Sequence, residues 1–207
     1  MEAAIVNRTL PRVGAAIVSV TVFLFAVCLA VDFSFGSYFV CMLLPMGYIM
    51  LAAGLRWESG ADRRVAADIG LVFAGIYAVL VLLVYFAQTT SVRLDGLNDQ
   101  ALRLLDFGRG GLIFHYDLLG YGMMALSTFF LGLSMKPQGK ADKWLKAFMT
   151  VHGAFFLPCF LLPMTGMFRS MAEGDTSAGG GAALLAWCAY FLPIGILACK
   201  HFGKQNK

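Results

Sequence analysis

The chain has 207 residues, of which 59% are hydrophobic and only 14% are charged, whereas a soluble domain is about half apolar and about a quarter charged. Its apolar residues gather in long blocks rather than in the periodic stripes of helices that face a water-soluble core. This composition excludes an ordinary soluble protein and indicates one that lies in lipid. The net charge of +4 is explained below by basic residues near helix ends, so we expect no nucleic-acid partner.

Six apolar blocks follow one another along the chain. Each is close to the roughly 20 residues that a helix needs to cross about 30 Å of hydrocarbon. The blocks lie at 13–31, 33–55, 69–87, 112–135, 147–168 and 182–199. We therefore expect an all-α fold: a polytopic membrane protein whose single domain, 1–207, is a bundle of six transmembrane helices in contact with the lipid bilayer.

The first block follows two basic residues, Arg8 and Arg12, as the core of a signal peptide would. The block 13–31 is long for such a core, and no small-residue cleavage site follows it. We interpret it as a retained helix.

The basic residues of the connections predict how the chain is oriented, because Lys and Arg near helix ends resist translocation. One side of the bundle would hold Arg8, Arg12, Arg56, Arg63, Arg64, Lys136, Lys140, Lys143, Lys146, Lys200, Lys204 and Lys207. The other side would hold only Arg93, Arg103, Arg109 and Arg169. The sequence therefore predicts that both termini are cytoplasmic.

The longest connection, 88–111, contains LNDQALRLLDF, in which Leu97, Ala101, Leu104 and Leu105 recur at helical spacing. This pattern predicts a short helix on the membrane surface. Two interpretations stay open: a lid over the outer ends of the spans, or a tether that shields loop backbone.

Neither a metal nor another cofactor is expected. The five cysteines all fall within predicted spans and form no CxxC pair, so we interpret them as small apolar packing residues. His115 and His152 would lie near opposite membrane faces, which argues against a haem held by two histidines.

The fourth block carries the most informative polar residues. Asp117 lies about 7 Å inside the predicted outer boundary at 1.5 Å per residue, where an ionised carboxylate is costly unless it faces protein, water or a cation. Tyr121, Met124 and Thr128 share its helical face. This face predicts either a contact surface for a proton, an ion or a polar ligand, or a hydrogen-bonded seam between helices.

Two further residues are candidates near the same membrane face. His115 is two residues from Asp117 and points about 200° away on a helix, so it more simply reaches the headgroups. Asp32 lies at the turn between the first two blocks, from which it can approach Asp117. Four prolines inside spans, Pro45, Pro158, Pro163 and Pro193, predict kinks.

The segments FHYDLLGYGMMALSTFFLGL, ADKWLKAFMTVHG and WCAYFLPIGIL resemble an uncharacterised family of small six-helix bacterial inner-membrane proteins. The resemblance implies six helices and the inner membrane of a bacterial cell, and it assigns no functional residue.

Three hypotheses about function follow. The first is a small permease, or a sensor of a small or lipid-like ligand, with an outward-facing pocket at Asp117, Tyr121 and Thr128 and with His115 and Asp32 nearby. The second is a membrane-embedded enzyme that acts on a lipid or a quinone with Asp117 or His115 as acid or base. The third is a structural partner of another membrane protein. The sequence decides neither among them nor on an oligomeric state, although the lack of soluble-enzyme motifs makes an enzyme the weaker choice.

Overall fold

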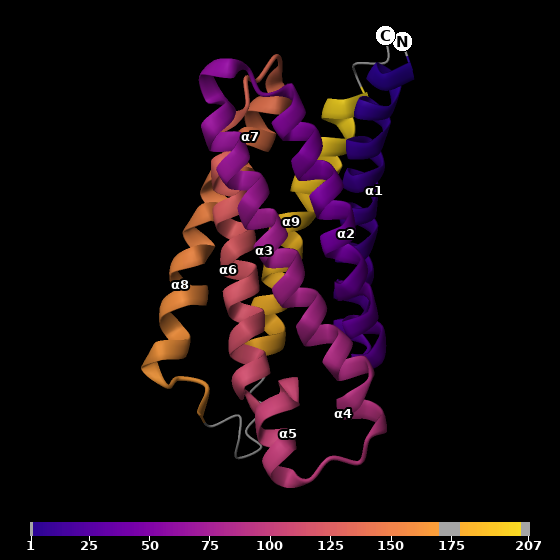
Figure 1. Cartoon of the computed structure of the whole chain (residues 1–207), viewed down its shortest axis with the longest axis vertical. Coiled ribbons are helices and arrows are strands. Elements are labelled where there is room, and N and C mark those ends of the chain that lie inside the picture. Colours follow the sequence, from indigo (N-terminus) through magenta and orange to yellow (C-terminus); the bar gives the residue numbers. More distant parts are fainter. Residues whose placement is uncertain (1, 170–178, 204–207) are drawn as a thin grey trace.

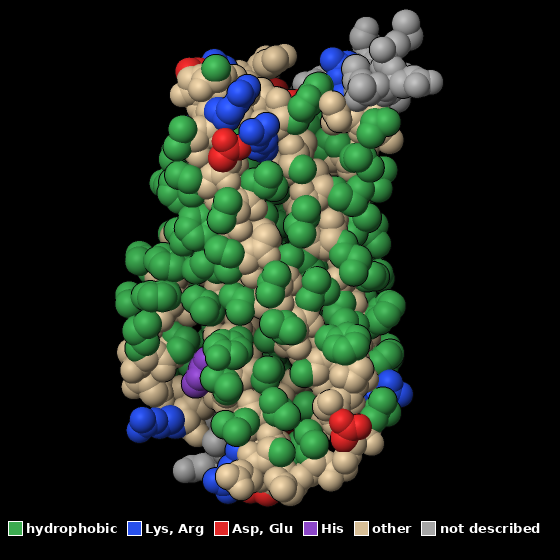
Figure 2. All heavy atoms as spheres, viewed as in Figure 1, with side chains coloured by type: hydrophobic (Ala, Val, Ile, Leu, Met, Phe, Trp, Pro, Cys, Tyr) green, Lys and Arg blue, Asp and Glu red, His purple; other side chains and the backbone are tan. Residues whose placement is uncertain are grey.

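A computed structural model describes residues 2–169 and 179–203 of the chain, and it is helical throughout, with no strand among those residues. Lys204, Lys207 and most of the last predicted outer connection lie outside the described residues. Six segments are long and apolar enough to cross a membrane, which confirms the all-α bundle of six spans. Hydrophobic side chains cover the middle of the visible face, and charged side chains lie toward its two ends (Figure 2).

The α-helices that form the first four spans are α1 (Glu2–Ala30), α2 (Ser34–Glu58), α3 (Arg64–Thr89) and α6 (Leu112–Ser134). The fifth span begins with α7 (Lys140–His152) and continues through η3 (Gly153–Phe155), α8 (Phe156–Leu161) and η4 (Leu162–Thr165). The sixth is α9 (Gly179–Gly203). Short helices in the connections are η1 (Ala61–Arg63), α4 (Ser91–Leu94), α5 (Asp99–Leu105) and η2 (Phe107–Arg109).

The helices form a closed ring in which neighbours pack in the order α1, α2, α3, α6, α7, α9 and back to α1. Small residues let the backbones approach closely, as is usual between membrane helices. A Cβ atom built on Gly14 of α1 would lie 2.5 Å from the Gly47 carbonyl oxygen of α2. A Cβ atom on Gly70 of α3 would lie 2.7 Å from the side chain of Leu131 on α6. The interior is filled by large side chains such as Tyr48, Tyr77, Met124 and Phe191, all of which are fully buried.

The fifth span is broken into α-helical and 3₁₀ pieces rather than running as one helix over 147–168. Pro158 and Pro163 have no N–H to donate to the carbonyls four residues before them, Ala154 and Cys159. The 3₁₀ turns η3 and η4 contain or adjoin these positions. The α-helix is therefore interrupted near these two prolines, whereas α2 and α9 each contain their proline within one continuous helix. The kinks expected at the four prolines stay a prediction.

The two ends of the bundle differ in what they carry. The start of α1 and the end of α9 lie at one end, together with the α2–α3 and α6–α7 connections; we call this the terminal end (Figure 1). The other end carries the short helices α4 and α5, and we call it the α5 end. The helix α5, Asp99–Leu105, matches the predicted surface helix. Its first turn is capped by the Asn98 side chain, which accepts from the Ala101 N–H at 2.9 Å.

Several spans extend further than the hydropathy predicted, among them α1, which begins at Glu2 rather than at 13, and α3, which covers Arg64–Thr89 rather than 69–87. Three more extensions lie at polar helix ends. The helix α2 continues to Glu58, α7 begins at Lys140, and α9 continues to Gly203, beyond the expected limits at 55, 147 and 199. The reason is that polar residues in these end turns find partners in neighbouring helices, as described below. The extensions bring Glu58, Asp142 and His201 into the bundle.

Candidate functional site

Asp117 lies inside the bundle near the α5 end, with 3% of its surface exposed. It shares a buried face of α6 with Gly120, Met124 and Thr128. Its Oδ1 atom is buried and has no hydrogen-bond partner, while the Tyr85 hydroxyl of α3 is a hydrogen-bond partner of the carboxyl group. A buried carboxylate that is incompletely paired costs several kcal/mol. Asp117 is therefore a group that gains from binding a proton or a cation.

Hydroxyl and thiol groups from four helices lie close enough to Asp117 to interact with its charge. Five of them are Tyr38 and Cys41 of α2, Tyr77 and Tyr85 of α3, and Tyr121 of α6, and we call these five residues with Asp117 the Asp117 cluster. The sixth is Cys159 of α8. The rings of Tyr38 and Tyr85 stack with centroids 5.7 Å apart, and Tyr77 and Tyr121 meet edge to face, also at 5.7 Å. The Cys41 sulfur lies 3.8 Å from the Tyr121 hydroxyl.

A second polar atom of this cluster is also unpaired. The Tyr77 hydroxyl is buried without a hydrogen-bond partner, and leaving a buried hydroxyl unpaired costs about 1–3 kcal/mol. Natural proteins leave few such atoms, and each one calls for an explanation. Two unpaired atoms, one on Asp117 and one on Tyr77, within one cluster make it the leading candidate for a ligand site.

The connection between α3 and α6 closes the cluster at the α5 end. The ring of Phe107 contacts Tyr38 and Tyr85 at centroid distances of 6.0 and 6.1 Å, and it meets Phe114 at 5.2 Å. Gln88 at the end of α3 holds the connection: its Nε2 donates to the Leu105 carbonyl at 2.7 Å, and its Oε1 accepts from the Phe107 N–H at 3.0 Å. These contacts hold the segment against the cluster, and the lid and the tether both stay predictions.

The polar residues deeper in the bundle are paired with one another. The Tyr48 hydroxyl donates to Ser127 Oγ at 2.8 Å, and Ser127 donates to the Gly70 carbonyl at 2.7 Å. Thr128 Oγ1 lies 2.8 Å from His152 Nδ1, and Trp187 Nε1 donates to His152 Nε2 at 3.2 Å. Since Nε2 accepts, a neutral His152 has its proton on Nδ1 and donates to Thr128. Thr128 therefore belongs to a packing seam with α7 and α9.

The structure places the five sequence candidates in different surroundings. Asp117 and Tyr121 lie together in the Asp117 cluster, while Thr128 faces inward further along α6 and bonds to His152. His115 is half-buried beside the Phe114 ring, with centroids 6.1 Å apart. Asp32 is exposed at the α1–α2 turn, where its φ of 53° is in the left-handed region. Neither of these last two is enclosed with Asp117.

Sequence reasoning missed a second polar cluster at the terminal end. His201 of α9 is 8% exposed; its Nε2 lies 2.6 Å from Glu58 Oε2 of α2, and its Nδ1 lies 3.1 Å from Asp142 Oδ1 of α7. We call these three residues the His201 cluster. One signal was available: His201 follows Ile194 and Ala198, both fully buried, at the seven- and three-residue spacings of one helix face.

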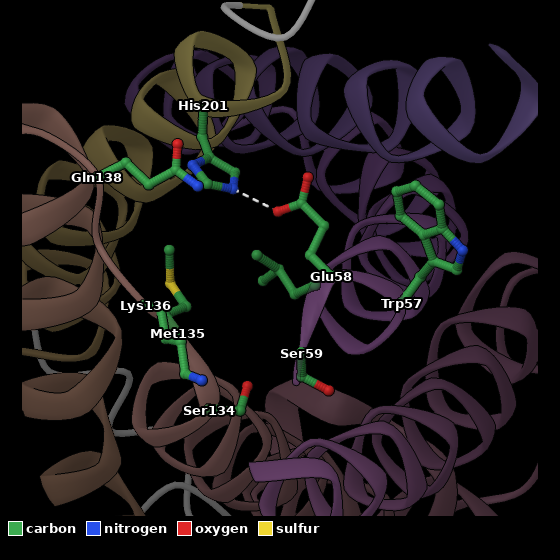
Figure 3. A pocket seen from close by; sticks show the side chains of 9 residues that line it. Trp57, Glu58, Ser59, Ser134, Met135, Lys136, Gln138 and His201 are labelled. Atoms are coloured by element: carbon green, nitrogen blue, oxygen red, sulfur yellow. Dashed lines mark hydrogen bonds and ion pairs between the residues drawn. The ribbon is translucent and has the colours of Figure 1, made fainter. Parts of the chain in front are cut away.

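A cavity of about 260 Å³ adjoins the His201 cluster (Figure 3). Its lining is Leu55, Trp57, Glu58, Ser59, Ser134, Met135, Lys136, Gln138 and His201. The side chains of Glu58 and His201 point toward each other at its edge. Between this cavity and the Tyr48–Ser127 pair lie the apolar side chains of Leu51 and Leu131, which are 1% and 0% exposed.

Among the described residues, no group of three His, Cys, Asp or Glu side chains is arranged to hold a metal ion. No protein-family model, no curated protein and no solved structure matches this chain. The case for a function therefore stands on the geometry of the two clusters.

Proposed function

We propose that this chain is a small membrane permease or sensor that binds a proton or a small cationic ligand at Asp117. The observation that carries the proposal is the Asp117 Oδ1 atom, which is buried inside the bundle with no hydrogen-bond partner. A ligand that brings a positive charge or an N–H donor would remove the cost of that unpaired oxygen. The tyrosine rings around it add surfaces that attract cations.

The pairing pattern along α6 argues against a purely structural role for Asp117. A hydrogen-bonded seam satisfies its polar atoms, as Ser127 and Thr128 do. Asp117 does not follow that pattern, although it lies on the same buried face. The enzyme hypothesis is also less well supported, because His115 and Asp32 lie in more exposed surroundings than Asp117.

Access from the α5 end fits the proposal. Phe107 covers Tyr38 and Tyr85, and this cover is held through the side chain of Gln88. Movement of the segment around η2 would expose the cluster without unfolding a spanning helix. The apolar layer at Leu51 and Leu131 would separate the site from the terminal end in this closed state.

The proposed orientation places the terminal end in the cytoplasm, because most basic residues of the connections belong to that end. The site would then open to the outside. A bacterial inner membrane is the location that the sequence resemblance implies, and it stays a prediction.

Carbodiimide labelling and flux measurements test the proposal. A hydrophobic carbodiimide reacts with protonated carboxyl groups in apolar surroundings, so we expect it to label wild-type protein at Asp117. Labelling that remains in the Asp117→Asn variant belongs to other buried carboxyl groups such as Asp142. Protons, Na⁺, K⁺ and methylammonium are the probes. A probe that binds the site should slow the labelling of Asp117. If the protein is a permease, that probe should also cross the membrane of proteoliposomes that contain wild-type protein; if the protein is a sensor, it should not cross.

The matched control is Asp32→Asn, which removes an exposed carboxylate near the same end of the bundle. This variant should label and transport like wild type. If the Asp117→Asn variant equals wild type in labelling, in protection by every probe and in flux, Asp117 is not the binding group and the proposal is wrong.

A further inference from the structure

The hydrogen bonds of the His201 cluster determine how many protons it holds. Two N···O contacts join the imidazole of His201 to carboxylates, at 2.6 Å to Glu58 and at 3.1 Å to Asp142. Each contact needs one hydrogen atom. A neutral imidazole supplies one N–H, and an ionised carboxylate supplies none. One further proton must therefore be present, either on the second ring nitrogen or on the facing carboxyl oxygen.

We propose that Glu58, Asp142 and His201 form a proton-binding site that ties the ends of α2, α7 and α9 together. With the proton bound, both contacts are hydrogen bonds, and those that an ionised carboxylate accepts are charge-assisted and about twice as strong as neutral ones. Without it, one ring nitrogen presents a lone pair to a carboxylate oxygen, and that contact becomes repulsive. Loss of the proton therefore releases the end of α9 from α2 or from α7.

Other polar and charged groups lie near the cluster, and Glu58 Oε1 within it is buried without a hydrogen-bond partner. From α7, Asp142 also accepts from the Gln138 N–H through Oδ2 at 3.2 Å, so this carboxylate is held in position. Lys136, before α7, lines the cavity and is paired with Asp62 at 2.9 Å. From α1, Arg12 lies beside Gly203, 3.8 Å from a Cβ atom built there. Glu58 is the titratable group that α2 contributes to the contact.

Loss of the proton would change the cavity beside the cluster. Glu58 and His201 both line the cavity of about 260 Å³ at the terminal end. The cavity is already partly open, since the exposed side chains of Trp57 and Lys136 line it, and separation of α9 from α2 would widen it. The site is independent of the function proposed for Asp117, because the apolar residues Leu51 and Leu131 lie between the two clusters.

Nitrogen-15 NMR of protein labelled at histidine, in lipid nanodiscs, tests the site directly. The chain has three histidines, and the His115→Gln variant assigns one set of signals while leaving the cluster intact. While α9 is protected, we expect His201 to show two protonated nitrogens, or one protonated nitrogen and one that shares a proton with a facing carboxyl group. Raising the pH further should convert His201 to one protonated and one unprotonated nitrogen.

Hydrogen exchange at the end of α9 tests the tie. In wild type, protection of the amides around Ala198–Phe202 should fall about tenfold to a hundredfold when His201 loses the proton, as expected for one charge-assisted hydrogen bond. The Glu58→Gln variant is the matched comparison, because its amide N–H can donate to the unprotonated Nε2 without an extra proton. Its protection should therefore not depend on pH beyond the intrinsic chemistry of exchange.

The Asp142→Asn variant provides the same comparison on the other side of the ring if Glu58→Gln does not fold. The proposal is overturned if, at every pH at which the protein is folded, His201 of wild type is neutral and its unprotonated nitrogen receives no hydrogen bond from a protonated carboxyl group, while α9 stays protected. It is equally overturned if wild type and both variants show the same pH dependence of protection.

Discussion

Asp117 and Thr128 lie eleven residues apart on one buried face of α6, about three helical turns. Their polar atoms differ in how completely they are hydrogen-bonded. Thr128 Oγ1 donates to the Ala125 carbonyl at 2.8 Å and accepts from His152, so its hydrogen-bonding capacity is used. Asp117 leaves Oδ1 unpaired. At the scale of single residues, completeness of pairing separates a packing contact from a candidate binding group better than residue type does.

His152 is the packing residue for which this distinction gives a direct prediction. The change His152→Ala removes the acceptor of the Trp187 N–H and leaves a cavity among Phe155, Tyr190 and Phe191. We expect a loss of about 2–4 kcal/mol in the free energy of unfolding, measured by denaturant titration in detergent micelles. The half-buried His115 is the control, and His115→Ala should cost less than about 1 kcal/mol. Equal losses for the two changes would show that His152 is not a structural anchor.

At the scale of helices, glycine contacts and helix interruptions at proline determine how the spans pack. The helices α1 and α2 meet through Gly14 and Gly47, where no side chain keeps the backbones apart. The fifth span does the opposite: its prolines interrupt the helix, and its last pieces, α8 and η4, pack mainly against α6 and each other. The site is consequently built from α2, α3 and α6, which are continuous helices.

The contact at Gly14 predicts a sharp difference between two glycines of the same protein. The change Gly14→Ala places a Cβ atom 2.5 Å from the Gly47 carbonyl and 2.7 Å from Met50 Cβ, so α1 must shift, at a cost of about 1–3 kcal/mol. The matched change Gly75→Ala on α3 meets nothing within 4 Å and should be neutral or stabilise the helix by about 0.5–1 kcal/mol. Thermal unfolding in detergent measures both, and a tolerated Gly14→Ala would contradict this account of the α1–α2 contact.

At the scale of the whole molecule, an apolar middle separates two charged ends (Figure 2). The apolar surface is extensive, with exposed side chains such as Phe23, Val72 and Leu83 more than half accessible. In lipid this exposure carries no penalty, because helices that face acyl chains need no polar surface. The basic residues at the two ends predict how the bundle is oriented.

The orientation is tested with an impermeant thiol reagent in a variant whose five cysteines are replaced. Asp95→Cys at the α5 end and Lys140→Cys at the terminal end both present an exposed position. Because basic residues resist translocation, the cysteine at position 95 should label in intact cells and the one at position 140 only after permeabilisation. The reverse pattern would place the Asp117 cluster on the cytoplasmic side.

The six spans could be predicted because hydropathy over about 20 residues decides whether a helix crosses lipid, and no tertiary contact is needed for that decision. The burial of Asp117 and its shared face with Thr128 also followed from helical spacing alone. The helix ends could not be predicted in the same way. Glu58, Asp142 and His201 are polar, so hydropathy ends each span before them, and only their mutual contacts account for the longer helices.

The hydrogen-bond partners of the interior polar residues could not be predicted from one sequence either. Nothing in the spacing of His152 shows that Trp187, 35 residues later, donates to its ring. The unpaired oxygen of Asp117 is likewise a result of how α2, α3 and α6 pack. Helical periodicity indicates which residues face inward, and it does not indicate which inward atoms stay unpaired.

The way Gln88 holds the connection near η2 has a consequence for how that segment moves. One amide group engages the backbone at Leu105 and again at Phe107, so displacement of either point strains the bond to the other. The segment should therefore not loosen gradually; it should detach in one step, exchanging between a fully seated and a fully released arrangement. Opening of that end of the bundle would then be all-or-none, and its rate would depend on the hydrogen bonds of one side chain.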